Sequence, residues 1–274
     1  MPELPEVDSI ARSLRRGNGK LPLPGQRIVS VSIRWPRHIA KPSASSFRRR
    51  IRDRLIQDVK RRGKYIVFPL DKDTMLIHLR MSGDLHLVAQ GTSRGRYDRT
   101  VFHLDSGQEL RFSDSRKLGK VYLLKNPGQL LNRLGPEPLD ENFTPQALTT
   151  RLSKHRRAIK SLMLDQSFLA GLGNIYTDEA LHLAKLNPLR RSDSLSSSEI
   201  TALWHGIRDA LHQGILHNGA SIDWVYRGGT FQNFFKVYQR AGEPCQECGT
   251  CIQRTVVSQR GTYYCPSCQP EVSP

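Results

Sequence analysis

The change from strand-like to helix-like patterns along this 274-residue chain restricts its fold more than any other feature. Between residue 27 and about residue 124, short runs rich in β-branched and aromatic residues alternate with turn residues, at intervals typical of a β-sandwich or barrel. One helix-compatible basic stretch, SFRRRIRDRLI, interrupts these runs. The later apolar spacing is helical, in the segments 145–165, 175–186 and 196–218. The sequence therefore predicts an α+β protein.

An amphipathic helix is predicted before the β-rich region, and a linker after it. Leu4, Val7, Ile10 and Leu14 recur every three or four positions over residues 2–17 and line one helix face, which packs on the β-sandwich. Three prolines and a glycine in RLGPEPLDENFTPQAL indicate a domain boundary. The expected order is a catalytic β-sandwich domain (1–132), a linker (133–150), a helical domain (151–240) and a zinc finger (241–270).

All five cysteines follow residue 244, and four of them have the spacing of a zinc site. Cys245 and Cys248 form one C-x-x-C pair and Cys265 and Cys268 form another, so each turn can present two sulfurs to one ion. The intervening TVVSQRGTYYC indicates two short strands around QRG, as in a zinc ribbon. Two disulfides in a secreted protein are the alternative, which the acidic, non-signal-like N-terminus disfavours. We expect one structural Zn²⁺, with Cys251 left over as a free thiol.

The charge of the chain points to a polyanionic partner. Forty-two Lys and Arg against 25 Asp and Glu give a formal net charge of +17, and basic side chains displace condensed counterions from a phosphate backbone. Charge alone does not separate DNA, RNA and an anionic membrane. Because no run approaches the ~18 apolar residues that a membrane span requires, we expect no membrane partner and a cytoplasmic, nucleoid-associated protein.

The first residues, MPELPEV, allow two interpretations. Proline and acids in a first turn favour helix initiation. Removal of Met1 would instead expose Pro2 as a secondary amine, and an α-amino group has a pKa of about 7.7–8.0, far below that of lysine. Such an amine can attack an aldehyde-like carbon and form an iminium, with Glu3 as a neighbouring acid. These residues alone favour the helix interpretation.

In combination, these parts resemble the formamidopyrimidine-DNA glycosylases, a family of bacterial base-excision repair enzymes. The similarity is carried by PELPEV, RRGKY, HLRMSG, GPEPL, AGLGNIYTDEAL and CQECG…QRGTYYCPSCQ, and it covers essentially the whole chain. It implies a monomeric, bifunctional DNA glycosylase and AP lyase that removes 8-oxoguanine and formamidopyrimidines from double-stranded DNA without a small-molecule cofactor. It also implies two domains around a cleft, with Pro2 at the cleft and a helix-two-turn-helix around residues 164–184.

The resemblance also assigns the chemistry to particular residues. Pro2 attacks C1′ of the damaged nucleotide and Glu3 assists as an acid, after which both phosphates are eliminated in turn (β,δ-elimination). Lys64 in RRGKY serves the elimination, and Arg260 in QRGT contacts a phosphate and assists the second step. Further DNA contacts are implied for Asn174 in GLGNIY, Lys160 in RRAIK and His78 in HLRMSG. Without the resemblance, Lys64, Lys160 and Arg260 are ordinary surface charges.

The resemblance also covers residues that fill the space left by an extruded base. Some positions of this chain match the family residue, and others carry a different one. Met81 in HLRMSG and Arg116 in SDSRKLG match void-filling residues, although a lone Met at a strand end is usually core packing. Leu118 replaces a usual Phe, which keeps an apolar wedge but loses the stacking face. Tyr97 in RYDR replaces a DNA-contacting His, and its phenol can still hydrogen-bond a phosphate. The segment 221–240, which closes over the lesion in the family, is shorter than usual here.

Two other functions stay open. The chain could be an endonuclease VIII-like glycosylase for oxidised pyrimidines, although that sister branch usually opens Pro-Glu-Gly-Pro-Glu and Leu4 favours the formamidopyrimidine branch. It could also be a non-enzymatic zinc-finger nucleic-acid binder, which explains the charge and the cysteines but not Pro2-Glu3.

Overall fold

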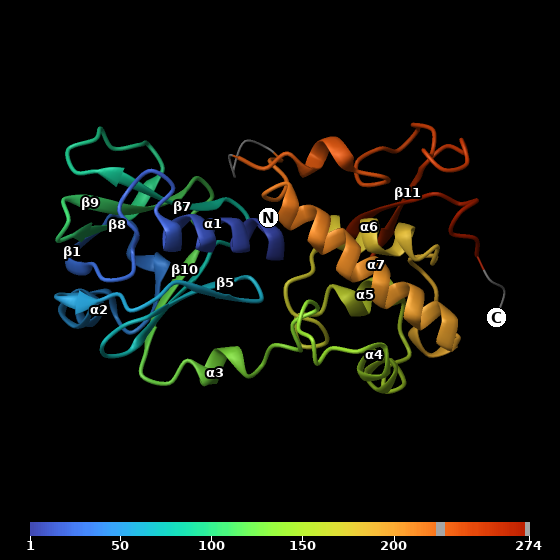
Figure 1. Ribbon diagram of the computed structural model, residues 1–274, viewed down its shortest axis with the longest axis horizontal. Coiled ribbons are helices and arrows are strands. Elements are labelled where there is room, and N and C mark those ends of the chain that lie inside the picture. The colour runs from blue at the N-terminus through green and yellow to red at the C-terminus, as the bar shows by residue number, and fades with distance from the viewer. Residues whose placement is uncertain (223–227, 272–274) are drawn as a thin grey trace. The chain divides into compact units, whose positions relative to one another are not determined.

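The computed structural model describes residues 1–222 and 228–271, and the chain divides into two compact units (Figure 1). The first unit is formed by Met1–Arg133 with Ser221–Gly229, and the second by Leu134–Ala220 with Thr230–Pro274. Residues 223–227, part of the segment expected to close over a lesion, lie outside the described residues. Among the described helices, none is both long enough and apolar enough to cross a membrane.

The described strands of the first unit form two five-stranded sheets that pack as a β-sandwich, as the sequence predicted. The strand orders are β3-β1-β8-β9-β7 and β2-β10-β6-β5-β4. The strands are β1 (Arg27–Ile33), β2 (Ile39–Lys41), β3 (Arg54–Leu55), β4 (Lys60–Arg62), β5 (Tyr65–Pro69), β6 (Thr74–His78), β7 (Gly83–Ala89), β8 (Asp98–Leu104), β9 (Gln108–Asp114) and β10 (Lys120–Leu124). Alternating burial in β7 and near-continuous burial in β9 place their apolar side chains in one core between the sheets.

Two helices cover opposite edges of this sandwich. Helix α1 (Leu4–Arg16) contacts β4, β5 and β7, which include the edge strand of each sheet on that side. Helix α2 (Ala44–Ile51) contacts β1 and β2 near the other edges, and its apolar residues Phe47 and Ile51 are fully buried. Helix α1 ends where predicted, because Gly17 adopts a left-handed φ of 86° and a Cβ there would lie 2.1 Å from the Lys20 carbonyl oxygen. A short helix, α3 (Gly128–Leu131), follows the last strand.

The second unit is helical, with a zinc-finger hairpin at its C-terminal end. Its helices are α4 (Pro145–Leu152), α5 (Ile159–Met163), α6 (Asn174–Leu183) and α7 (Ser197–Leu216), and its strands are β11 (Gln253–Val257) and β12 (Arg260–Tyr264). Ser196 caps α7 through a capping box with Glu199. Helices α6 and α7 cross closely at Gly206, where a Cβ would lie 2.6 Å from the Ala180 carbonyl oxygen.

Three local predictions differ from the structure. The segment 145–165 is two helices rather than one, because the chain turns at 153–158 and Ala158 forms a β-bridge with Arg191. The expected linker 133–150 is fixed to the helical unit, where the Trp204 indole donates to the Phe143 carbonyl at 2.6 Å. The hairpin turns at Ser258–Gln259 rather than at QRG. Both turn residues have positive φ, which matches the twist of a two-residue hairpin loop.

Candidate active site and zinc centre

The N-terminal Pro-Glu pair is built into the start of α1. Pro2 is buried and Glu3 is only 2% exposed, whereas Met1 is 48% exposed. Glu3 is the N-cap residue, and a capping box fixes it, since its backbone N–H donates to Glu6 Oε2 at 2.7 Å. A buried carboxylate is therefore held directly beside Pro2, and loss of Met1 would leave the Pro2 nitrogen at a helix N-terminus. Positive charge is disfavoured there by the helix dipole.

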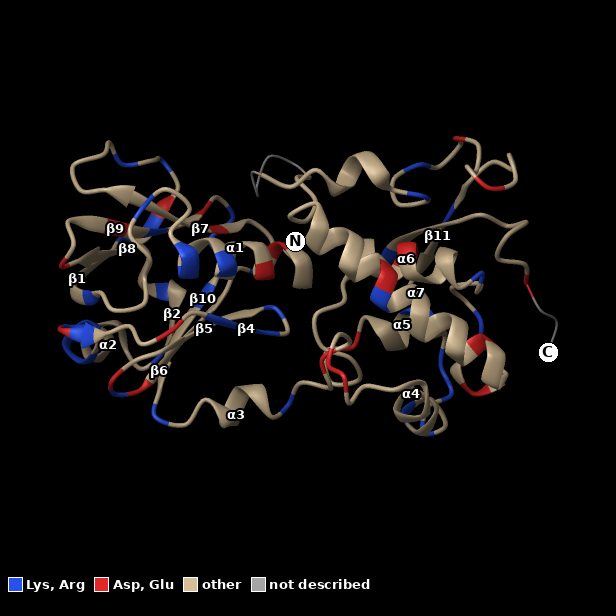
Figure 2. Ribbon diagram, in the orientation of Figure 1, with Lys and Arg blue, Asp and Glu red and all other residues tan. Residues whose placement is uncertain are grey.

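Lys64 lies in the turn between β4 and β5, which contacts α1. Arg61 of β4 links the two, since its Nε lies 3.5 Å from Asp8 Oδ1 on α1 and its Nη1 donates to the Gly63 carbonyl at 3.2 Å. Figure 2 shows the basic residues of this strand as a blue stretch. Lys64 itself is only 5% exposed, so the surface-charge interpretation is wrong for it.

His78, at the end of β6, is a neutral hydrogen-bond donor. Burial lowers its pKa, and the nearby charges of Arg80 and Lys64 lower it further, to about 3. The Arg80 backbone N–H donates to His78 Nδ1 at 3.0 Å, so the proton of the neutral ring is on Nε2. The imidazole therefore offers an N–H to an acceptor such as a phosphate oxygen without carrying charge.

The residues matched to base extrusion in the first unit, and Tyr97, are exposed. Met81 is 36% exposed on the turn after β6, so its interpretation as core packing is wrong. Leu118 is 41% exposed and Arg116 is also exposed, both in the loop between β9 and β10. Tyr97 is 44% exposed, and the guanidinium carbons of Arg96 and Arg99 each lie 5.7 Å from the centroid of its ring.

In the helical unit, Lys160 and Asn174 hold the finger hairpin. The Asn174 side-chain amide, at the first position of α6, donates to the Gly261 carbonyl at 2.8 Å. Lys160 is fully buried, donates to the same carbonyl at 3.1 Å, and forms an ion pair with Asp178 at 2.6 Å. Lys160 is therefore not a surface charge, whereas Arg260 is exposed at the start of β12.

Two acidic residues of α6 support the finger and were not predicted from the sequence. Asp178 accepts from the Tyr263 backbone N–H at 3.1 Å, and burial raises the pKa of Asp178 to about 7 although Lys160 acts in the opposite direction. Glu179 accepts from three successive backbone N–H groups, those of residues 236–238, at 2.8–3.0 Å. The sequence feature that could have indicated this role is an Asp-Glu pair in a predicted helix with apolar residues on both sides of the pair. Both carboxylates are buried; Glu179 fixes the segment that leads into the zinc finger, and Asp178 fixes strand β12 within it.

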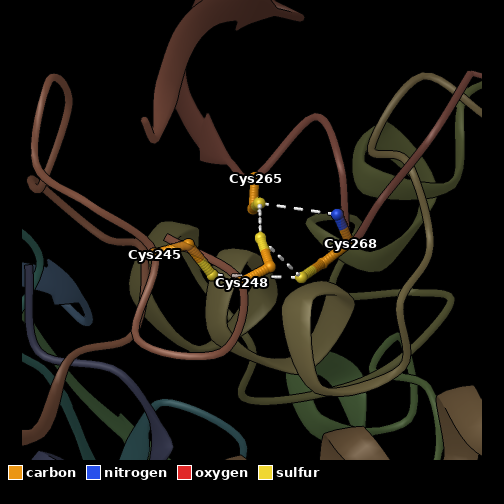
Figure 3. Close-up of side chains that lie close together, drawn as sticks. All are labelled: Cys245, Cys248, Cys265 and Cys268. Atoms are coloured by element: carbon orange, nitrogen blue, oxygen red, sulfur yellow. Dashed lines mark hydrogen bonds between the residues drawn. The ribbon is translucent and has the colours of Figure 1, made fainter. Parts of the chain in front are cut away.

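The four paired cysteines form the zinc centre (Figure 3). Their sulfurs lie within 4.8 Å of one another, and three of the separations are 3.9, 3.4 and 3.5 Å. A tetrahedral ion with Zn–S bonds of about 2.3 Å requires sulfurs about 3.8 Å apart, whereas a disulfide requires about 2.05 Å. The cluster is thus a site for one zinc ion, and disulfides are excluded. Cys251 is a free thiol outside the cluster, as predicted.

A zinc-finger hairpin fixed to a helix-two-turn-helix, in one chain with a β-sandwich whose first helix begins at Pro-Glu, defines a DNA-repair glycosylase of the zinc-finger class. Comparison with known families supports this class, because family models match most of the chain. Residues 1–121 match the formamidopyrimidine-DNA glycosylase N-terminal domain, residues 134–225 the H2TH domain of the same enzymes, and residues 242–270 the zinc finger found in FPG and IleRS.

Individual relatives resemble the chain from end to end. The formamidopyrimidine-DNA glycosylases of Herpetosiphon aurantiacus and Chloroflexus aurantiacus are each 44% identical, covering 98% of this chain and 100% and 98% of the relatives. A structure of MutM in complex with carbocyclic 8-oxo-G containing DNA matches with a TM-score of 0.91. The Lactococcus lactis FPG (MutM) in complex with a FAPY-dG containing DNA matches with 0.90. Both are 34% identical, over 98% of this chain and 100% of theirs. The chain belongs to the formamidopyrimidine-DNA glycosylase family.

Proposed function

We propose that this protein removes oxidised purines, 8-oxoguanine and formamidopyrimidines, from double-stranded DNA and then cleaves the strand at the resulting abasic site. The observation that carries this proposal is the buried Glu3 carboxylate, fixed beside Pro2 at the N-terminus of α1. The capping box also serves to start α1, but only an enzyme has a use for a buried acid next to the nitrogen that loss of Met1 exposes. As a DNA-repair enzyme, the protein acts as a monomer where the chromosome lies, in the nucleoid.

Before the reaction, removal of Met1 from the protein frees the Pro2 nitrogen. Its lone pair attacks C1′ of the damaged nucleotide, and the bond from C1′ to the base breaks. The electron pair leaves with the base, which takes up a proton. Opening of the sugar gives an iminium between Pro2 and C1′, and Glu3 protonates or hydrogen-bonds the sugar oxygen as this ring opens. The same iminium forms on an abasic site, which is already an aldehyde.

The iminium then acidifies the adjacent sugar protons, so the 3′ and 5′ phosphates can leave in two elimination steps. Lys64 is suited to the elimination because the turn that carries it joins two strands that contact α1, and Arg61 bonds both that turn and Asp8 of α1. Arg260, exposed at the start of β12, binds a phosphate and assists the second elimination. His78, Tyr97 and Asn174 are the other proposed backbone contacts. Lys160 acts through the hairpin, since its Nζ is bound to Asp178 and Gly261.

The damaged base must leave the stack before C1′ can be attacked, at a cost of a few kcal/mol. We propose that Met81, Arg116 and Leu118 offset this cost by filling the space it leaves, because all three side chains are exposed. Leu118 supplies apolar volume without an aromatic face, so it acts as a wedge rather than as a stacking partner.

Borohydride trapping on lesion-containing duplexes tests the chemistry, together with intact mass to identify the first residue. A covalent adduct through Pro2 is expected, with faster turnover of 8-oxoguanine than of thymine glycol. Faster turnover of thymine glycol would instead favour an endonuclease VIII-like specificity. Binding without any adduct would favour a non-enzymatic binder.

A further inference from the structure

Asp114, the last residue of β9, is a fully buried carboxylate that receives hydrogen bonds from several parts of the first unit. Its Oδ1 accepts from the Ser82 hydroxyl and from the Arg116 backbone N–H at 3.2 Å. Its Oδ2 accepts from the Gly119 backbone N–H at 2.7 Å and from His38 Nε2 at 3.2 Å. Four donors thus converge on two oxygens, one of them from a buried imidazole.

These donors flank the exposed residues that we propose to enter the DNA. Ser82 directly follows Met81, while Arg116 and Gly119 bound the loop that carries Leu118. The two loops are also joined directly, since the Arg116 N–H donates to the Ser82 hydroxyl oxygen at 3.0 Å. The Asp114 side chain therefore links two loops that are about 35 residues apart in the sequence.

The backbone of Asp114 holds a third exposed element. Its N–H donates to the Tyr97 carbonyl at 2.9 Å, and its carbonyl accepts from Arg99 Nε at 3.0 Å. Arg99 also lies over the Tyr97 ring. The segment that carries Tyr97 is thereby fixed to the same point as the Met81 and Leu118 loops.

The surroundings of Asp114 leave it little freedom to move. His38 is fully buried and stacks on Phe112, with ring centroids 4.6 Å apart. Gly119 is required at its position, because a Cβ there would lie 2.3 Å from the Phe112 ring and 3.1 Å from Asp114 Oδ2. Burial alone would raise the pKa of Asp114, but the hydrogen bonds from His38, Ser82 and Gly119 lower it to about 2, so the group is an anion at neutral pH.

We propose that Asp114 is a positioning residue for lesion extrusion, which holds the Met81 loop and the Arg116–Leu118 loop at a fixed separation so that both enter the DNA stack together. This inference rests on the proposed void-filling role of those residues. An anion accepts at both oxygens, whereas an amide has one acceptor oxygen and an NH₂ group that cannot accept from N–H donors. Asp114→Asn therefore releases at least one of the two loops.

The test compares Asp114→Asn with Glu109→Gln, a matched control at the opposite end of the same strand. Glu109 is also buried and charged, but its partners are Arg111 and His103 rather than the loops. The signal is the fluorescence of 2-aminopurine placed opposite the lesion, which reports insertion into the stack. For Asp114→Asn we expect loss of most of this signal and a fall of about tenfold or more in kcat for 8-oxoguanine excision, with KM changed less. Both quantities should stay within about threefold of wild type in Glu109→Gln.

Further variants keep the inference testable and separate it from the proposed function. If Asp114→Asn does not fold, Ser82→Ala removes the bond from the Ser82 hydroxyl to Asp114 and the bond that this hydroxyl accepts from the Arg116 N–H, but it keeps the other donors to Asp114. It should give a smaller loss of the same kind, which Ser82→Thr restores. Met81→Ala and Leu118→Ala test void filling itself, and unchanged fluorescence in them would overturn that part of the proposed function. If they lose the signal while Asp114→Asn and Ser82→Ala both behave like Glu109→Gln, the inference about Asp114 is wrong. Borohydride trapping on a single-stranded abasic site requires no side chain to fill the base stack. Its yield should therefore equal that of wild type in all of these variants.

Discussion

The ion pair between Lys160 and Asp178 makes the strongest prediction about stability. Both side chains are fully buried and their charged atoms lie 2.6 Å apart, so removal of one partner takes a buried counter-charge away from the other. Such changes typically cost about 3–5 kcal/mol. For a helical unit of this size, that loss corresponds to a fall of roughly 10–20 °C in Tm. Asp178→Asn should show this effect, because Lys160 then stays buried without the carboxylate that lies 2.6 Å from its Nζ.

The complementary variant Lys160→Met should show a pH-dependent cost. Burial already raises the pKa of Asp178 to about 7, and loss of the ammonium group raises it further above the value of the unfolded chain. The folded state then binds more protons than the unfolded state, so the free energy of unfolding increases as pH falls. Lys160→Met should therefore be less destabilised near pH 6 than near pH 8.

The assay is urea unfolding of the zinc-loaded protein, with zinc release to a chromogenic chelator measured in parallel. Because Lys160 and Asp178 bind β12 at Gly261 and Tyr263, zinc should leave both single variants faster than wild type. The double variant Lys160→Met, Asp178→Leu removes both charges and should recover most of the stability. The reasoning is refuted if Asp178→Asn costs less than about 1 kcal/mol, or if the double variant is as unstable as the sum of the single ones.

Four further predictions concern the N-terminus, the zinc centre and acid stability. One uncleavable residue before Pro2 should abolish base excision but leave lesion binding largely intact, because an acylated Pro2 nitrogen is an amide without a free lone pair; cleavage and gel-shift assays measure both. Glu3→Gln should impair 8-oxoguanine release more than cleavage of a preformed abasic site, and equal losses on the two substrates would contradict the acid role. Cys265→Ser should lower the zinc content below one ion per chain and weaken duplex binding, since the hairpin and Arg260 depend on the metal; elemental analysis and binding curves decide this. The low pKa of Asp114 implies stability that is present above its unfolded value of 3.8 and lost as pH falls through about 2. The stability difference between wild type and Asp114→Asn, followed by circular dichroism, should therefore shrink by about 2 kcal/mol between about pH 5 and pH 2.

Features that depend on short-range spacing could be predicted from the sequence. The three- and four-residue apolar spacing located α1, alternating β-rich runs located the sandwich, and two C-x-x-C pairs located the zinc site. The errors arose where tertiary contacts override local preference. Helical spacing continues through residues 153–158, but the β-bridge between Ala158 and Arg191 breaks the helix there. Glycine in QRG suggested a turn, yet Gly261 lies in a strand, where its carbonyl accepts from Lys160 and Asn174.

The residues of the candidate site also divide into those that the sequence could predict and those that it could not. The family motifs located exposed side chains, such as Met81 and Arg116, because each motif gives a residue type at a fixed position in the sequence. They did not identify Asp114, Asp178 or Glu179, each of which has a partner far away in the sequence: Ser82 for Asp114, Tyr263 for Asp178 and Val237 for Glu179. An acid in a motif such as SDSRKLG or YTDEAL is indistinguishable from a solvated one until the fold shows which donors surround it.

The buried carboxylates differ from the exposed side chains in what their loss should do. A side chain such as Met81 can be shortened with little effect on folding, because it has few neighbours to lose, so its variants report on DNA directly. Asp114 and Asp178 each bind backbone N–H groups of segments that carry exposed residues, so their loss leaves buried donors unpaired and moves those segments at the same time. Stability and activity should therefore fall together in variants of the carboxylates and separately in variants of the exposed residues. That difference can be measured without knowing how the two units are placed on DNA.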